Sequence, residues 1–244
     1  MKNFINWGLF TGFLLSGVVS CNFLEDFERG NGNLESRYHE VPEFNRVRIG
    51  GNFDVMLTPS EKSGVQVIAD ENLHDFIEFE VKNKNLEIIQ QKNLISKNKI
   101  RIILEYTVIE ELRITGAARI QNEGYIEEEE LNLRMDGAGM IDLRIRTGSL
   151  KVLLSGAGVI RISGSTERQD LNLSGAGSLK AFELESKFCN VQVSGLGGAE
   201  IYVTEVLDAT IEGIGGIEYD GNPSQVNTEI NGLGKIEPVE EYSN

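Results

Sequence analysis

Residues 152–161 read VLLSGAGVIR, and residues 171–180 repeat the same pattern as LNLSGAGSLK. In both stretches apolar residues alternate with other residues on either side of a Gly-Ala-Gly turn. Alternation with a period of two is typical of a strand that buries one face, and closely spaced glycines mark a sharp change of chain direction. The two stretches therefore predict a unit made of a strand, a corner and a second strand.

This unit recurs seven times between Leu112 and Glu237, at intervals of 18 to 21 residues. Apolar residues stand four and two positions before each corner glycine and four positions after it, and only Thr228 among these 21 positions is polar. Such a period, without helical segments, predicts an all-β fold: a single-stranded β-helix, or β-solenoid, with rungs of about 19 residues that are stable only when stacked. The first glycine of each corner is Gly116, Gly137, Gly156, Gly175, Gly195, Gly213 or Gly232.

A second glycine follows two positions later in six of the seven corners. These structural glycines are Gly139, Gly158, Gly177, Gly197, Gly215 and Gly234, and Ala118 takes their place in the first corner. The residue between the two glycines is alanine in four corners and leucine or isoleucine in three. We expect this side chain to point into a narrow core.

Residues 41–111 are expected to form an N-terminal β-rich unit that contains the first rungs and caps one end of the solenoid, which occupies residues 112–237. Val47–Leu57 alternates as a strand should and is predicted to form a hairpin-like unit with Val65–Val67. A helical turn over Asp70–Ile77, with Asp70 as its cap, comes next. Further strands are predicted at residues 79–81, 86–89 and 100–106. An open solenoid end needs cover, and the polar tail 238–244 or an oligomer could supply it at the other end.

The N-terminus has the pattern of a lipoprotein signal peptide. Lys2 precedes an apolar run that ends at Val18-Val19-Ser20-Cys21 and resembles a bacterial lipobox. We expect residues 1–20 to be removed and Cys21 to be acylated; the alternatives are a short membrane anchor or an ordinary signal peptide. Residues 21–40, rich in glycine, asparagine and charge, are expected to be a flexible tether. The protein is then a lipid-anchored (palmitate-bearing) cell-envelope protein, attached to the outer membrane and facing either the surface or the periplasm.

Composition limits the partners of this chain. With 23 Lys and Arg against 38 Asp and Glu, its net charge is −15, which disfavours binding to nucleic acid. Acylation of Cys21 leaves Cys189 without a partner, so no intramolecular disulfide is expected. Cys189 lies in a column that is otherwise leucine or valine, and we interpret it as buried and unreactive.

The sequence contains no arrangement typical of catalysis or of a cofactor. Its two histidines, His39 and His74, fall outside the repeat and are interpreted as surface residues without a role. The Gly-x-Gly corners lack the βαβ context of a dinucleotide site. The acidic run Glu127–Glu130 is interpreted as a solvated loop. No catalytic residue, metal ligand or cofactor is therefore predicted.

One outward column suggests a surface that binds a partner. Arg161, Lys180 and Glu200 each stand five positions after a corner glycine, so stacking should make them neighbours in a polar strip. Ordinary solvated charges on a sheet face would give the same pattern.

Three features together resemble a known family, the head GIN domain family of auto-transporter adhesins, which are lipoproteins of the Bacteroidota. They are Val47–Val55 (VRIGGNFDV), Val65–Leu73 (VQVIADENL) and the repeated Gly-x-Gly turns. The resemblance covers about residues 41–237. It implies a β-helical fold, an envelope location and an adhesive role, and it implies no catalytic residues.

Three functional hypotheses follow. The leading one is a non-catalytic, lipid-anchored protein whose solenoid surface binds a protein or a glycan. The second is a β-helix enzyme that acts on acidic polysaccharide through acidic residues with Arg161 or Lys180. The third is a structural spacer without a ligand.

Overall fold

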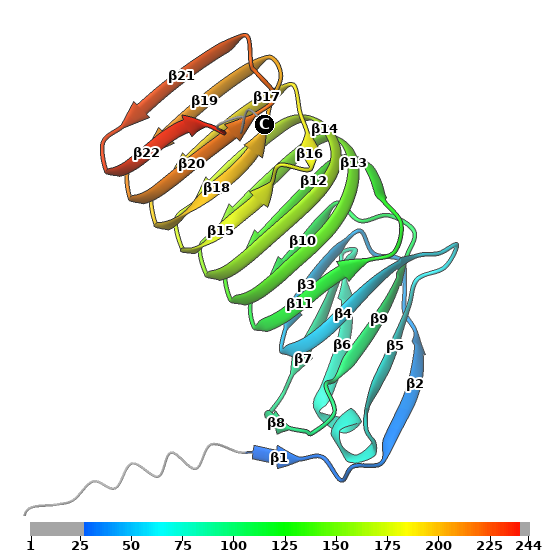
Figure 1. Cartoon of the computed structure of the whole chain (residues 1–244). Coiled ribbons are helices and arrows are strands. Elements are labelled where there is room, and N and C mark those ends of the chain that lie inside the picture. The colour runs from blue at the N-terminus through cyan, green and yellow to red at the C-terminus, as the bar shows by residue number, and fades with distance from the viewer. Residues whose placement is uncertain (1–26, 240–244) are drawn as a thin grey trace, which may run out of the picture.

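The structure is a computed structural model that describes residues 27–239 (Figure 1). Within this range the chain is nearly all strand, and the short 3-10 helix η1 (Glu71–Phe76) is the single helical element. In the described residues, no helix has the length and the apolar character needed to cross a membrane. The predicted signal peptide 1–20, the lipidation site Cys21 and most of the tail 238–244 lie outside the described residues.

The chain winds into a β-solenoid of about seven turns whose rungs are about 19 residues apart, which confirms the predicted fold class. One long sheet holds the segments that precede the corners: β3 (Arg46–Gly50), β10 (Glu111–Ile114), β12 (Ile126–Met135), β17 (Phe188–Val193), β19 (Val206–Ile211) and β21 (Gln225–Ile230). The second holds the segments that follow them: β4 (Asn52–Pro59), β11 (Ala117–Asn122), β15 (Ala176–Ala181), β18 (Leu196–Tyr202), β20 (Ile214–Asp220) and β22 (Leu233–Pro238). The long strands β13 (Ala138–Leu154) and β14 (Ala157–Leu173) bend and join both sheets, and β16 (Leu184–Glu185) lies beside that bend.

Neighbouring rungs pair in parallel and in register, so that equivalent residues form columns. In the column four residues before the corner, Leu133, Val152, Leu171, Val191 and Ala209 are at most 2% exposed. No single rung could bury these side chains alone, and stacking removes them from water at about 25 cal/mol for each Å² of apolar surface. The repeat predicted from the apolar pattern is therefore the core of the molecule.

The corner glycines are required because the rungs approach so closely. A Cβ on Gly156 would lie 1.8 Å from the carbonyl oxygen of Gly137 in the previous rung. The second glycine meets a similar obstacle: a Cβ on Gly158 would lie 2.0 Å from the carbonyl oxygen of Gly139, and its φ of +146° disfavours any other residue. Backbone packing, rather than a ligand, thus explains the Gly-x-Gly pattern.

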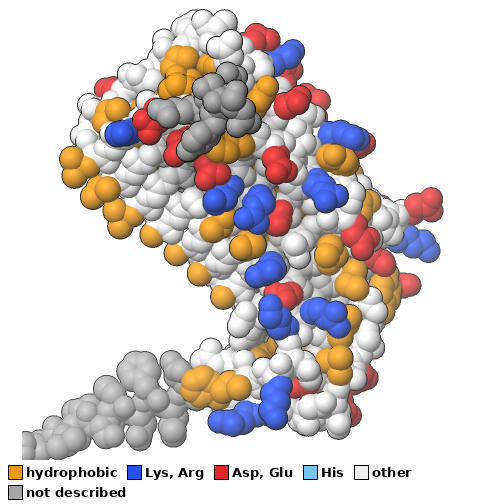
Figure 2. Space-filling model, in the orientation of Figure 1, with side chains coloured by type: hydrophobic (Ala, Val, Ile, Leu, Met, Phe, Trp, Pro, Cys, Tyr) orange, Lys and Arg blue, Asp and Glu red, His pale blue; other side chains and the backbone are white. Residues whose placement is uncertain are grey.

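The predicted direction of the side chain between the two glycines is wrong. Leu196, Ile214 and Leu233 are 59%, 53% and 70% exposed, and the equivalent alanines are exposed as well. Residues two and four positions after the first glycine face inward, so strand alternation turns the residue between the glycines toward solvent. As a result, a line of hydrophobic side chains runs along the corner edge of the solenoid (Figure 2).

The N-terminal unit continues the solenoid by strands that are distant in sequence. β7 (Asn85–Gln90) pairs in parallel with β3, and β9 (Arg101–Tyr106) pairs in parallel with β4. Antiparallel strands then close this end: β6 (Ile77–Lys82) on β7, β5 (Gly64–Asp70) on β9, and β2 (Leu34–Glu40) on β5.

The hairpin predicted between Val47–Leu57 and Val65–Val67 is wrong. A corner at Gly51 divides the first segment into β3 and β4, which belong to different sheets, and β9 lies between β4 and β5. The helical turn after Asp70 is present as η1, but the Asp70 side chain does not cap it. That carboxylate is 1% exposed and accepts hydrogen bonds from Ser96 and Asn98, which hold its pKa below the ordinary value.

The predicted flexible tether is wrong for residues 27–40. β1 (Phe27–Arg29) pairs in parallel with β8 (Asn93–Ile95), and all seven residues of β2 pair with β5. The polar composition of this segment suggests a tether, but its side chains alternate as in a strand. Every second side chain of β2 is half-buried against the rest of the N-terminal unit. Residues 21–26 lie outside the described residues.

Candidate functional site

The structure brings the predicted strip together. Arg161 is paired with Lys180 in the next rung, and Lys180 with Glu200 in the rung after it. The column neutralises its own charges, because Arg161 lies 3.5 Å from Asp142 and Lys180 lies 3.3 Å from Glu200. On the face shown in Figure 2, basic and acidic side chains likewise lie next to one another. The strip therefore offers little uncompensated charge to a ligand.

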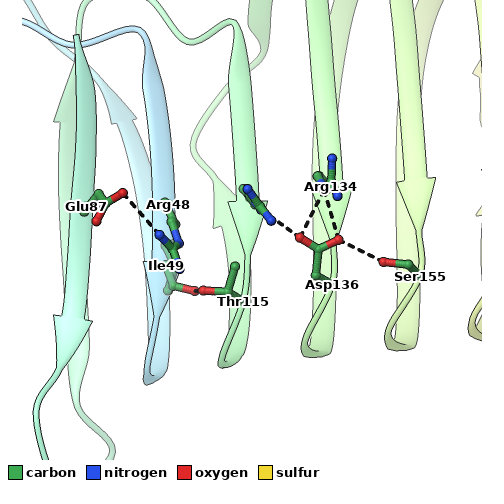
Figure 3. Close-up of polar contacts among 8 residues, drawn as sticks. Arg48, Ile49, Glu87, Thr115, Arg134, Asp136 and Ser155 are labelled. Carbon is green, nitrogen blue, oxygen red and sulfur yellow. Dashed lines mark hydrogen bonds and ion pairs between the residues drawn. The ribbon is translucent and has the colours of Figure 1, made fainter. Parts of the chain in front are cut away.

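A second set of side chains, not found from the sequence, lies on the sheet that precedes the corners. Arg48, Arg113 and Arg134 occupy consecutive rungs of one outward column, which we call the arginine row (Figure 3). Each arginine stands three residues before a corner glycine, where strand alternation turns the side chain to solvent. The side chains are 43%, 37% and 44% exposed, so all three guanidinium groups are accessible.

Asp136 holds two of these arginines in place. Its Oδ2 accepts a hydrogen bond from Arg113 Nε at 2.7 Å, and its Oδ1 accepts one from Arg134 Nε at 2.9 Å. Arg134 Nε also donates to Oδ2 at 3.0 Å, and Ser155 Oγ donates to Oδ1 at 2.8 Å (Figure 3). Partial burial opposes ionisation of Asp136, but the hydrogen bonds from Ser155, Arg134 and Arg113 outweigh it and lower the pKa of this carboxyl.

The row extends into the N-terminal unit through Arg48, whose Nη1 lies 3.3 Å from Glu87 on β7. A pocket of about 380 Å³ opens beside it. Its charged lining consists of four cations and two carboxylates, namely Arg46, Arg48, Lys82, Arg113, Glu87 and Glu111. Cations thus outnumber carboxylates in the lining, on a chain whose net charge is −15, although Lys82 also pairs with Glu80 and Arg113 with Asp136 outside it.

The geometry of the row suits an anion with several charges. Parallel pairing sets the backbones that carry successive arginines about 4.8 Å apart along the solenoid. Arg113 and Arg134 donate to Asp136 through their Nε atoms, so these hydrogen bonds do not use the terminal Nη groups. Guanidinium groups bind carboxylate, sulfate and phosphate through two parallel N–H bonds.

A signal for the arginine row was present in the sequence. Gly51 is a corner glycine, since Gly116 stacks on it and a Cβ on Gly116 would lie 2.5 Å from the Gly51 nitrogen. Indexing the repeat from Gly51 places Arg48 in one column with Arg113 and Arg134. The second glycine of this corner is replaced by Phe53, which hides the relationship.

The other residues considered from the sequence have structural roles. Cys189 is 2% exposed, as predicted, and burial raises the pKa of its thiol. The prediction of two surface histidines is wrong for His74, which is 7% exposed with Nε2 3.2 Å from the Glu35 carbonyl oxygen. The ring of His39 packs near the ring of Phe79, with 5.1 Å between the two ring centroids.

The acidic run Glu127–Glu130 is a strand rather than a solvated loop, because it pairs with β13 as the first part of β12. Glu127 lies 2.8 Å from Arg146 in the next rung, and Glu128 accepts a hydrogen bond from the backbone of Ile109. Partial burial raises the pKa of Glu128. Across residues 27–239, no three His, Cys, Asp or Glu side chains are grouped so that they could hold a metal ion.

The fold and the exposed basic column together define a class: a parallel β-solenoid whose sheet faces, rather than an enclosed cleft, present the polar groups. Residues 43–223 match the family described as "Putative auto-transporter adhesin, head GIN domain". The match spans more than half of the chain, so this chain belongs to that family. Adhesins act at surfaces, and membership therefore indicates a protein of the cell envelope or cell surface.

Solved structures share the fold. A protein from Bacteroides fragilis called a putative adhesin has a TM-score of 0.83 at 24% identity, over 87% of this chain and 100% of that chain. A protein from Parabacteroides distasonis called a putative lipid binding protein has a TM-score of 0.69 at 24% identity, over 88% of this chain and 100% of that chain. A putative adhesin from the same species has a TM-score of 0.66 at 23% identity, with the same coverage. The comparison with curated proteins found no match.

Proposed function

We propose that this chain is a lipid-anchored adhesin of the cell envelope that binds an anionic glycan through the arginine row, without catalysis. The observation that carries the proposal is the stacking of Arg48, Arg113 and Arg134 in consecutive rungs, with Asp136 fixing two of them. The family name supports adhesion, and the excess of cations over carboxylates in the lining of the pocket beside the row supports an anionic ligand.

Preorganisation gives the row its advantage over scattered arginines. A free arginine side chain loses rotamer entropy of about 2 kcal/mol when it is fixed on a ligand. Asp136 already restricts Arg113 and Arg134 in the free protein, so a ligand does not have to order them. A polymer with an acidic group on successive sugars would contact several arginines at once, and each contact raises the effective concentration for the next.

The net charge of −15 sharpens selectivity. It repels polyanions from most of the surface, so that an anionic glycan binds where positive charge is concentrated. Binding should therefore weaken as ionic strength rises, because salt screens the attraction of exposed arginines for the ligand.

The binding experiment compares the purified protein on an array of neutral, carboxylated and sulfated glycans. Arg113→Gln and Arg134→Gln should each weaken binding to the anionic glycans by roughly tenfold, which corresponds to the loss of one charged hydrogen-bonded contact. Arg161→Gln is the matched control, because it removes an exposed arginine from the opposite sheet. An equal loss of affinity for anionic glycans in Arg161→Gln, or a preference of the wild type for neutral glycans, would contradict the proposal.

The absence of catalysis is tested on the same glycans. The length of each bound polysaccharide should stay constant during incubation with the protein. Shortened chains that disappear with Arg161→Gln or Lys180→Gln would replace the proposal by a carbohydrate-active enzyme that uses the other sheet.

The anchor is tested separately from the ligand. Labelled palmitate should enter the wild-type protein and not Cys21→Ala, and protease added to whole cells should remove the protein if it faces outward. β1, the first described strand, lies at the cap end of the molecule, far from β21 and β22 (Figure 1). An anchor there would direct the solenoid away from the membrane.

A further inference from the structure

The last described rung of the solenoid has a free sheet edge. Among residues 27–239, β21 pairs only with β19, and β22 pairs only with β20. The outer N–H and C=O groups of both strands are thus open to another strand. All six residues of β21 are exposed, unlike those of any earlier strand of the same sheet.

The apolar core is also open at this end. Leu207 and Ile211 of β19 are fully buried, whereas Val226 and Ile230, which follow them in the same columns, are 39% and 46% exposed. Thr228 lies between them and is the polar exception in its column. Exposed apolar side chains next to the unpaired edge of a strand are typical of a surface that binds another protein chain.

The strand β21 lacks the devices that keep sheet edges apart. Natural edge strands carry inward-pointing charges, prolines or bulges, but the inward-facing residues here are Val226, Thr228 and Ile230, and β21 contains no proline. At the opposite end of the solenoid, β7 and β9 are each covered by an antiparallel strand. The outer strands at that end, β2 and β6, carry charged side chains (Glu35, Arg37, Glu78, Glu80 and Lys82), so the free edge of a second copy is the better partner.

We propose that two copies of this chain associate through this end about a two-fold axis, with β21 antiparallel to β21 of the second copy. A register centred on Thr228 places Val226 opposite Ile230 of the second copy, which continues the apolar core across the interface. The same register places Asn227 opposite Glu229, so that the amide donates to the carboxylate. Because the same edge is used by both copies, association closes at the dimer and does not form a fibre.

Thr228→Cys in the full-length chain, in its own cell envelope, tests this geometry. Directly opposed residues of antiparallel strands have Cβ atoms about 4.5 to 5.5 Å apart, and a disulfide needs about 3.5 to 4.5 Å, so a small movement of the two strands allows the bond to form. Mild oxidation of whole cells should give a band of doubled mass that a reducing agent removes. The wild type controls for Cys21 and Cys189. Ser174→Cys is the matched control, because Ser174 is exposed at the corner between β14 and β15, in the middle of the solenoid. No doubled band, or an equal band from Ser174→Cys, would overturn the proposal.

A second variant separates association from folding. Val226→Lys puts a charge on the inward side of the edge, at a side chain that is already 39% exposed. In the Thr228→Cys background it should abolish the doubled band and leave the thermal unfolding temperature unchanged. A band that persists overturns pairing through β21. If the thiol introduced by Thr228→Cys resists both the oxidant and a maleimide on intact cells, another segment covers β21, and the second copy is excluded.

Salt distinguishes this association from glycan binding. Each chain carries a net charge of −15, so two copies repel each other and the doubled band should strengthen as salt screens the repulsion. A band that weakens with salt would show that the contact depends on ion pairs, contrary to the apolar interface proposed.

Discussion

The carbonyl oxygen of Gly137 fills the space in which a side chain on Gly156 would have to lie, at 1.8 Å from the Cβ position. The same relationship links each corner glycine to the one in the preceding rung, with separations of 1.8 to 2.2 Å from Gly156 to Gly232. The obstacle is backbone rather than a movable side chain, so the rungs would have to separate to relieve it. The corners are thus the least tolerant positions of the solenoid.

Gly156→Ala should consequently lower the free energy of unfolding by about 3 kcal/mol, as overpacking does in a rigid core. For a chain of this size the unfolding temperature should fall by roughly 5 to 10 °C, measured by circular dichroism. Gly216→Ala is the matched control, since the nearest atom to its Cβ position is 3.8 Å away. Equal losses in the two variants would show that the cost is not steric.

Asp136→Asn should destabilise the protein by about 1 kcal/mol at neutral pH, a modest value because the ion pairs with Arg113 and Arg134 are partly solvated. The pKa of Asp136 is lowered in the folded state, so its contribution is present above the unfolded pKa of about 3.9 and is lost as pH falls through the folded pKa. Chemical denaturation of both proteins at several pH values should show the difference shrinking below about pH 4. A difference that does not depend on pH would mean that the charge of Asp136 contributes nothing.

Cys189 should resist alkylation while the protein is folded. Burial raises the pKa of this thiol, so little thiolate exists, and its side chain is inaccessible to a bulky reagent. Mass spectrometry of the peptide that contains Cys189 should show modification by maleimide only at the rate of unfolding. Fast modification under native conditions would indicate that this part of the core opens frequently.

Tyr106→Phe should leave the free energy of unfolding unchanged or raise it by up to about 1 kcal/mol, because it removes a buried hydroxyl that lacks a partner among the described residues. Burial, and to a lesser extent Glu128, raises the pKa of Tyr106 to about 12. The folded state keeps this proton after the unfolded state has lost it, so wild-type stability should fall as pH rises above 10. Denaturation between pH 9 and pH 11 should show a smaller decline for the variant. A loss of stability in Tyr106→Phe at neutral pH would reveal a hydrogen bond to the hydroxyl.

The repeat was predictable because every rung buries its apolar side chains against the next rung in the same way. Leu154, Leu173 and Val193 recur before the glycines, since every rung must present an apolar side chain to the next. The cap was less predictable. Its pairings join β3 to β7 and β4 to β9, and the residues that pair are too far apart in sequence for any local pattern to reveal.

The arginine row was missed for a related reason. Gly51 and Gly116 are 116 − 51 = 65 residues apart in sequence, although their rungs are adjacent in the structure. The cap strands occupy the intervening chain, so the interval does not match the regular period. The strip of Arg161, Lys180 and Glu200 was predictable because no insertion separates its rungs.

In-register pairing means that the length of this molecule and the chemistry of its surface can change independently. Insertion of one further rung between β14 and β15 would lengthen the rod by about 4.8 Å and leave both ends as they are. Replacement of an outward side chain would alter one position along a surface whose spacing the backbone alone maintains. Evolution can therefore change the length of the solenoid one rung at a time and its surface one side chain at a time, without redesigning the rest of the fold.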